Sequence, residues 1–147
     1  MILSIVVPAH NEEDNIGDCI ARVESVIDIP HELIVVNDHS SDRTVEIIKE
    51  MARKYPNVRL IDNLSAPGFV NALKAGFSLA QTDLVVPVMG DLCDDLSTIK
   101  NMLKKIEEGY DVVCGSRYMS GGARIGGSRL KAFLSRTAGR SLYRIMG

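Results

Sequence analysis

Three carboxylates follow a run of strand-forming residues in the stretch VPVMGDLCDD, which spans residues 86–95. They are Asp91, Asp94 and Asp95, and a predicted helix begins directly after them. Carboxylates at such a point serve either as turn and helix-cap residues or as ligands of a hard cation such as Mg²⁺, which prefers oxygen. The stretch therefore predicts either a helix start or a cation site.

Polar residues also follow three other predicted strands. PAHNEE follows the first strand, NDHSSD the second and GSRY the fifth. Parallel strands end at one edge of a sheet, and ligands of open α/β sheets bind beyond that edge, so this recurrence favours a binding site there. For Asn11, Ser41 and Asp42, a turn or cap role is the favoured interpretation. The candidates at the edge are His10, Asn11, Glu12, Asn37, Asp38, Asp91 and Arg117.

The elements that would position these residues alternate along the chain. Apolar runs predict strands over residues 3–7, 33–37, 58–62, 84–89 and 111–115. Helical periodicity predicts helices over residues 14–27, after Ser41 and Asp42, over 68–79 and over 96–108. Apolar strands that are each followed by a helix indicate a mostly parallel sheet with helices on both faces, the Rossmann-like α/β class. Pro8 is predicted to end the first strand, and Pro87 to mark a bulge or a sheet edge.

The composition is typical of one globular domain. The chain has 147 residues, of which 46% are hydrophobic and 24% charged, with a net charge of −2. The first apolar run, ILSIVV, is too short for a membrane span, so we expect a cytoplasmic protein. Cys19, Cys93 and Cys114 form no CxxC pair, which argues against a disulfide framework or a zinc site.

Several common active-site motifs do not occur in the sequence. No GxGxxG follows the first strand and no GxxxxGKS/T is present, so neither a dinucleotide site nor a P-loop is supported. His10, His31 and His39 could be imagined in a Ser–His–Asp arrangement, but no nucleophile elbow accompanies them. The loops at the sheet edge remain the candidate site, and no nucleic acid partner is expected.

The charge is unevenly distributed. No Asp or Glu follows Asp111, whereas the basic residues there are Arg117, Arg124, Arg129, Lys131, Arg136, Arg140 and Arg144. This asymmetry predicts an anionic partner at the C-terminal end, with a solvated basic face as the alternative. Residues 129–146, which follow a glycine-rich loop at 119–127, are predicted to form a basic amphipathic helix. Such a helix suits either an anionic membrane surface or core packing with a solvated arginine face.

Five segments, in this order, resemble the family 2 glycosyltransferases. They are LSIVVPAHNEEDNI, ELIVVNDHSSDRTVEI, APGFVNALKAGF, VVPVMGDLCDD and EEGYDVVCGSRYMSGG. The resemblance runs from residue 2 to about 145 and is to the branch of dolichol-phosphate mannosyltransferase and the polyprenyl-phosphate glycosyltransferases. It implies the GT-A nucleotide-diphospho-sugar transferase fold. It also implies that residues 1–147 are a single domain without the C-terminal, acceptor-side portion with which the family continues.

The resemblance implies a site for a nucleotide-diphosphate sugar such as GDP-mannose or a UDP-sugar. By position in the motifs, the lining residues would be Pro8, His10, Glu12, Val36, Asp38, Gly90 and Asp91. A carboxylate suits this role because it accepts hydrogen bonds from base N–H groups and ribose hydroxyls. Asp38 has a second interpretation, as a cap of the helix that follows it.

The resemblance also decides how the three carboxylates of the first stretch are interpreted. The family's Asp-x-Asp metal motif aligns with Met89-Gly90-Asp91, so a thioether replaces the first carboxylate. Mg²⁺ or Mn²⁺ can bind through one carboxylate with waters and substrate phosphates. We therefore predict Asp91 as the metal ligand and Asp95 as a helix cap, and Asp94 is left open between the two roles.

The implied reaction is inverting transfer of the sugar to a polyprenyl phosphate. Asp91 and Arg117 would be catalytic, since a cation and a guanidinium stabilise the charge of the departing nucleoside diphosphate. Arg117, Arg124 and Arg129 would bind the acceptor phosphate, which needs no general base, and the C-terminal helix would contact the membrane peripherally. The alternatives are transfer to a glycan hydroxyl and an inactive nucleotide-sugar-binding domain.

Overall fold

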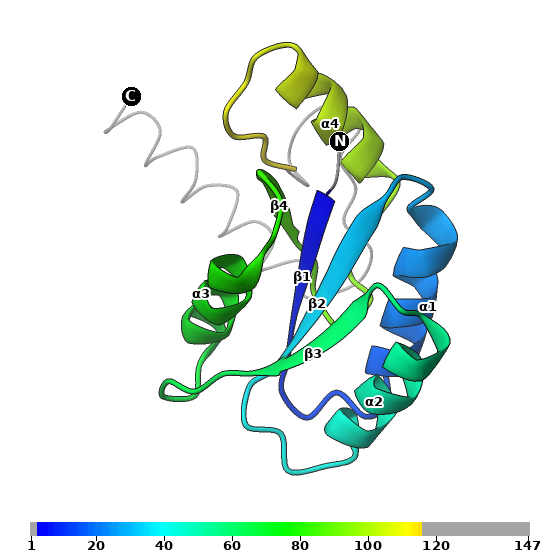
Figure 1. Cartoon of the computed structure of the whole chain (residues 1–147), viewed down its shortest axis with the longest axis vertical. Coiled ribbons are helices and arrows are strands. Elements are labelled where there is room, and N and C mark those ends of the chain that lie inside the picture. Colours follow the sequence, from blue (N-terminus) through cyan, green and yellow to red (C-terminus); the bar gives the residue numbers. More distant parts are fainter. Residues whose placement is uncertain (1–2, 116–147) are drawn as a thin grey trace, which may run out of the picture. The chain divides into compact units, whose positions relative to one another are not determined.

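The computed structural model describes residues 3–115, which fall into two compact units, residues 3–97 and residues 98–115. The sheet belongs entirely to the first unit (Figure 1). Predictions for Arg117, Arg124, Arg129, the loop 119–127 and the helix 129–146 lie outside the described residues. The single-domain assignment of residues 1–147 stays a prediction.

The first unit alternates strands and helices, as the sequence predicts. Its elements are β1 (Leu3–Ala9), α1 (Ile16–Val26), β2 (His31–Asn37), α2 (Thr44–Lys54), β3 (Val58–Asp62), α3 (Phe69–Leu79) and β4 (Leu84–Pro87). The four strands are parallel, in the order β3-β2-β1-β4. The α/β prediction is therefore confirmed. Because β2 and β3 extend from one side of β1 and β4 from the other, the strand order reverses at β1.

The sheet is covered on both faces by helices of the first unit. Figure 1 shows α3 on one side of the strands and α1 with α2 on the other. Side chains alternate between the faces, and Val6, Ile34 and Val36 pack with Ala72 of α3. Every residue of 33–36 is fully buried. Continuous burial explains why these strands are apolar throughout rather than alternating.

Helix α3 packs closely against the sheet because its inner face carries the small residues Ala72 and Gly76. A Cβ added to Gly76 would lie 2.3 Å from Val6 Cγ1 and 3.1 Å from Val36 Cγ2, so glycine is required there. The larger apolar residues Phe69 and Phe77 of the same helix are exposed. The close packing of α3 fixes the spacing between β1, β2 and the start of α3.

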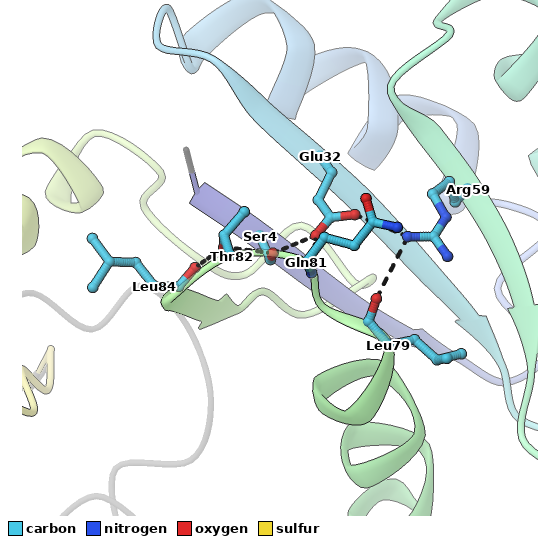
Figure 2. A network of polar contacts seen from close by, with 7 residues as sticks. All are labelled: Ser4, Glu32, Arg59, Leu79, Gln81, Thr82 and Leu84. Carbon is cyan, nitrogen blue, oxygen red and sulfur yellow. Dashed lines mark hydrogen bonds and ion pairs between the residues drawn. The ribbon is translucent and has the colours of Figure 1, made fainter. Parts of the chain in front are cut away.

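A polar network holds the amino end of the sheet (Figure 2). Glu32 of β2 accepts hydrogen bonds from Ser4 Oγ at 2.5 Å, Gln81 N at 2.6 Å and Arg59 Nη1 at 3.0 Å. Burial of Glu32 raises the pKa of its carboxyl, but these hydrogen bonds outweigh burial and the net pKa is lowered. The network joins β1, β2 and β3 to Gln81, which lies between α3 and β4.

Pro8 and Pro87 lie in strands at positions where the missing N–H is not needed. The prediction that Pro8 ends the first strand is wrong, because β1 continues to Ala9. Val6 O accepts from Val88 N, so Pro8, two residues after Val6, faces the β4 side beyond the last β1–β4 pair. Pro87 faces the outer edge of β4, which confirms the edge interpretation.

The predicted fifth strand is absent from the part of the chain that the structure describes. Residues 111–115 have no regular secondary structure, and Val112 is 78% exposed. An apolar run forms a strand only when a neighbouring strand supplies ladder hydrogen bonds, and none pairs with these residues there.

Helix α4 (Thr98–Glu107) belongs to the second unit and begins two residues after the predicted start. Asp95 Oδ1 accepts from the backbone N–H of Ser97 at 3.1 Å and from its hydroxyl at 2.7 Å. These hydrogen bonds form a turn directly before the helix, which agrees with the predicted cap role. Within residues 3–115, no helix has the length and apolarity needed to cross a membrane.

Candidate functional site

The carboxyl ends of β1 and β4 meet at the point where the strand order reverses. A Cβ placed on Gly90 would lie 3.4 Å from Pro8 O and 3.8 Å from Glu12 Cγ. The structure therefore brings together Pro8, Glu12 and Gly90, with Asp91 beside them in the chain. A crevice at such a reversal is the usual ligand site of open α/β sheets.

The loops after β1 and β2 are joined by hydrogen bonds between their backbones and side chains. Asn11 and Ser40 lie side by side, as do Glu12 and Thr44. The contacts are Asn11 N to Ser40 Oγ (3.1 Å), Ser41 N to Asn11 Oδ1 (2.8 Å), Glu12 N to Thr44 Oγ1 (2.8 Å) and Glu13 N to Asp42 Oδ2 (3.1 Å). Asn11 and Asp42 therefore shape the loops, in agreement with the turn and cap interpretation, and the two loops form one connected surface.

His10 is exposed at this edge with a defined tautomer. Its Nδ1 lies 2.6 Å from the carbonyl oxygen of Asp38. Because a carbonyl can only accept, Nδ1 carries the proton and Nε2 is the acceptor of the neutral ring. Nε2 lies 3.3 Å from the Asn11 amide nitrogen. His31 begins β2 at the opposite end of the sheet, where it contacts Glu24, so it does not share a site with His10.

Asp38 is a buried carboxylate that ties β2 to the start of α3. Its Oδ1 accepts from Asn63 Nδ2 at 2.6 Å, and its Oδ2 accepts from the backbone N–H of Gly68 at 2.9 Å. Asp38 is 6% exposed, and Gly68 has φ of +147°, a conformation that glycine adopts readily. The side chain of Asp38 therefore contacts the connection between β3 and α3, and its hydrogen bonds do not cap α2, the helix that follows it.

Asn63 was not singled out from the sequence, although it follows the third strand in the way that the other candidates follow theirs. Val36 is fully buried in the core beneath the edge, so its side chain does not reach the surface. Glu12 is half-buried, and its Oε2 accepts from Asn15 Nδ2 at 3.1 Å. Among the predicted lining residues of the described chain, Pro8, His10, Glu12, Gly90 and Asp91 thus gather at the edge.

The loop after β4 separates the roles of its first two carboxylates. Asp94 Oδ2 accepts from the backbone N–H of Met89 at 2.7 Å, so its side chain turns back across the loop. Asp91 is exposed, and its Oδ1 accepts from the backbone N–H of Cys93 at 3.1 Å. Of these two carboxylates, Asp91 is thus the more exposed and the more accessible to a ligand.

The Cys19 thiol of α1 is buried behind this loop, within the electrostatic influence of three carboxylates. Burial, together with the negative charges of Asp94, Asp91 and Glu12, raises the pKa of the Cys19 thiol to about 11 against the opposing positive charge of Arg22. The thiol therefore stays protonated at neutral pH. It donates to the carbonyl oxygen of Met89, with Sγ 3.6 Å from that oxygen.

The donor atoms at the loop suit a cation that is shared with a bound diphosphate. Within residues 3–115, no group of three or more His, Cys, Asp and Glu side chains is placed to hold a metal ion. Asp91 supplies one accessible carboxylate, whereas the thioether of the neighbouring Met89 is a poor ligand for a hard cation. Mg²⁺ is commonly held by one or two carboxylates, with waters and substrate phosphates completing the octahedron. The residues present fit that incomplete donor set.

The sequence matches a known family over almost its whole length. The family described as "Glycosyl transferase family 2" matches residues 4–145. The dolichol-phosphate mannosyltransferase of Pyrococcus furiosus is 33% identical over 123 residues, covering 83% of this chain and 35% of that protein. The undecaprenyl-phosphate 4-deoxy-4-formamido-L-arabinose transferase of Edwardsiella ictaluri is 31% identical over 148 positions, covering 95% of this chain and 45% of that protein.

The fold also matches that of a solved glycosyltransferase. The mannosyltransferase PcManGT from Pyrobaculum calidifontis, solved in complex with GDP-Man and Mn²⁺, superimposes with a TM-score of 0.60 at 25% identity. The match covers 69% of this chain and 31% of that one. The predicted GT-A fold is confirmed by this likeness. In each of these comparisons, the chain spans less than half of its relative's length.

Proposed function

Because this chain belongs to glycosyl transferase family 2, we propose that it transfers a sugar from a nucleotide-diphosphate donor to a polyprenyl phosphate, with inversion at the anomeric carbon. The observation that carries the proposal is the sequence likeness to proteins named as dolichol-phosphate and undecaprenyl-phosphate transferases. The clustering of polar residues where β1 and β4 meet supports it, because a donor needs a site at that edge.

The donor would bind across the ends of β1 and β4. His10 Nε2 and the Glu12 carboxylate are hydrogen-bond acceptors at this edge, suited to the N–H groups of a base or the hydroxyls of a ribose. The buried Gly90 places the backbone after β4 beside Pro8. GDP-mannose is the first donor to test, because the solved mannosyltransferase was crystallised with GDP-Man, and UDP-sugars are the second.

Asp38 and Val36 would support the nucleoside pocket from beneath. Both oxygens of Asp38 already accept hydrogen bonds, and Val36 is enclosed in the core. The backbone carbonyl oxygen of Asp38 accepts a hydrogen bond from the His10 ring. Asp38 would therefore influence donor binding by orienting His10. A carboxylate oxygen has two lone pairs, so direct contact with a nucleoside is compatible with the internal hydrogen bonds.

Asp91 would hold Mg²⁺ or Mn²⁺ beside the diphosphate. The cation, when bound, would stabilise negative charge on the departing nucleoside diphosphate. Asp91 lies at the strand end, next to the buried Gly90, and its Oδ1 is oriented by the N–H of Cys93. The residue thus orients its carboxylate before a ligand arrives, which lowers the entropic cost of binding.

Acceptor binding would fall to the arginines that follow residue 115. Arg117, Arg124 and Arg129 would bind the lipid phosphate, with Arg117 also stabilising the leaving diphosphate. A phosphate that is ionised near neutral pH can attack the sugar without a general base. The basic helix of residues 129–146 would lie against the anionic membrane surface that contains the acceptor.

Met89 favours one competing candidate, a nucleotide-sugar-binding domain without catalytic activity. The thioether replaces the first carboxylate of the metal motif and is a poor ligand for Mg²⁺ or Mn²⁺. Transfer to a glycan hydroxyl is a further candidate, and it would require a carboxylate base near the acceptor. Metal dependence and acceptor preference distinguish the three.

The test is calorimetric titration of the 147-residue chain with GDP, UDP, GDP-mannose and UDP-glucose, each with Mn²⁺ and with a chelator. Micromolar binding of one nucleotide, strengthened by Mn²⁺, is the expected result. Transfer of radiolabelled sugar to a short-chain polyprenyl phosphate, but not to a free glycan, would then identify the acceptor. Binding without transfer to either acceptor would favour the inactive domain, and no binding of any nucleotide would contradict all three candidates.

A further inference from the structure

The loop after β4 is held at Met89 by a carboxylate of the loop itself and by a thiol of α1. The carboxylate of Asp94 accepts the backbone N–H of Met89 at 2.7 Å, and the thiol of Cys19 in α1 donates to the carbonyl oxygen of Met89 at 3.6 Å. The backbone N–H and the carbonyl oxygen of Met89 are therefore both hydrogen-bonded, directly before Gly90 and Asp91.

The same loop is held a second time on the other side of Asp91. Arg22, one helical turn after Cys19 in α1, donates from Nη1 to the carbonyl oxygen of Leu92 at 3.4 Å. Leu92 has φ of +62°, a left-handed conformation that is unfavourable for a residue with a Cβ. A backbone held in this conformation requires contacts that outweigh the cost, and the hydrogen bonds of Arg22 and Asp94 are such contacts.

We propose that Asp94, assisted by Cys19 and Arg22, is a positioning residue that holds the Met89–Leu92 segment in the shape in which Asp91 faces the donor diphosphate. The inference rests on the proposed function for the identity of the ligand. The sequence leaves Asp94 open between a helix cap and a metal ligand. Because its Oδ2 accepts the Met89 N–H, we assign it instead to shaping the loop. Asp94 contributes to binding through the backbone and not by ligating the cation.

The hydrogen bond of Asp94 to Met89 and the negative charge of Asp94 can be tested separately. An Asn at position 94 keeps an oxygen at the same distance and can accept the Met89 N–H, but it carries no negative charge. An Ala at position 94 removes both the acceptor and the charge. If Asp94 positions the loop, Asp94→Asn should behave like the unchanged protein; if Asp94 acts by its charge, Asp94→Asn should behave like Asp94→Ala.

The experiment compares Asp94→Ala, Asp94→Asn and Asp83→Ala in the 147-residue chain. Asp83 is an exposed acid before β4 and controls for the loss of one negative charge. The first measurement is amide hydrogen exchange by NMR without ligand. In Asp94→Ala we expect the Met89 amide to exchange at least tenfold faster, while the amides of β1 and β2 stay unchanged. Asp94→Asn should restore slow exchange.

The second measurement is calorimetric affinity for GDP and UDP in the presence of Mn²⁺. We expect roughly a tenfold loss in Asp94→Ala, most of the affinity restored in Asp94→Asn, and no change in Asp83→Ala. Unchanged Met89 exchange in Asp94→Ala would overturn the proposal, and so would an Asp94→Asn variant as weak as Asp94→Ala. Correct exchange behaviour with no nucleotide bound by the unchanged protein would overturn the proposed function but leave the positioning role of Asp94 established.

Discussion

The two ends of the parallel sheet use carboxylates in opposite ways. At the amino end, Glu32 is enclosed by donors from Ser4, Arg59 and Gln81, so its charge is balanced within the protein (Figure 2). At the carboxyl end, Asp91 remains exposed, and the negative charges near Cys19 are opposed there by Arg22. One end is thus built to stabilise the sheet, and the other keeps charge available for a ligand.

The two ends of the sheet also differ in their backbone conformations, because the left-handed non-glycine residues lie at the carboxyl end. Within residues 3–115, the non-glycine residues with positive φ are Asn11, His39 and Leu92. Each of them follows a strand at the carboxyl end, where loops must turn sharply to present side chains. Unfavourable backbone conformations of this kind gather at functional sites, where surrounding contacts hold them in place. The comparison predicts that substitutions at the amino end reduce stability and those at the carboxyl end reduce binding.

The largest effect is expected at the amino end, for Glu32→Ala. The substitution would leave the Gln81 N–H without its acceptor and the Arg59 guanidinium with only the longer hydrogen bond to Leu79 O, and we expect the free energy of unfolding to fall by about 2–3 kcal/mol. Urea denaturation would measure this loss. Nucleotide affinity of the folded variant should stay unchanged, and an affinity loss in the folded variant would contradict the separation of the two ends.

Asp38→Asn examines a buried carboxylate at the carboxyl end that, like Glu32, accepts hydrogen bonds from within the protein. The amide NH₂ would face either Asn63 Nδ2 or the Gly68 N–H, so a donor would meet a donor. We expect the free energy of unfolding to fall by about 1–3 kcal/mol. Urea denaturation beside Asp83→Asn, an exposed control, would measure it. A stability equal to that of the control would show that the internal hydrogen bonds of Asp38 contribute little.

Asp91→Asn should affect binding and leave stability nearly unchanged. Because Asp91 is exposed, we expect the free energy of unfolding to change by no more than about 0.5 kcal/mol. The affinity for a nucleotide with Mn²⁺ should fall at least tenfold, which corresponds to about 1.4 kcal/mol. Calorimetry with Mn²⁺ and with chelator would separate the metal-dependent part. An unchanged Mn²⁺ dependence would rule out Asp91 as the ligand.

The smallest effect is the pH dependence that Glu32 contributes to stability. The net pKa of Glu32 is lowered in the folded chain, so its contribution is fully present above the unfolded pKa of about 4.3 and is lost as the pH falls through the folded pKa. The difference in free energy of unfolding between the unchanged protein and Glu32→Gln should therefore shrink as the pH falls below about 4. A constant difference from pH 7 to pH 3 would contradict this assignment.

The order and type of the elements could be predicted from the sequence because each strand is a continuous apolar run followed by a helical period. Val58–Asp62 was predicted with the observed bounds. The errors concern pairing. Whether Pro8 ends a strand depends on where its pairing with β4 stops. Whether residues 111–115 form a strand depends on a partner strand. The residues around each position do not specify these pairings.

The candidate site was predictable where one rule applies, that polar residues after parallel strands share an edge. The rule placed His10, Glu12 and Asp91 together. It also applies to Asn63, which directly follows β3, but it does not say which residues at the edge bond to one another, such as Asp38 with Asn63 and Gly68. Nor could it show that Asp94 turns back to Met89, since that contact needs the left-handed backbone of Leu92, which leucine does not favour.

The central place of β1 has a consequence for how the protein folds. β1 pairs on one side with β2, which follows soon after it, and on the other with β4, about 80 residues further along the chain, so the second pairing closes a much longer loop. We expect β1, β2 and β3 to associate first and β4 to join last. Pulsed hydrogen exchange during refolding would then show the Val88 amide protected after the amides of β2. A refolding chain would therefore acquire most of its sheet before the edge where β1 and β4 meet is formed.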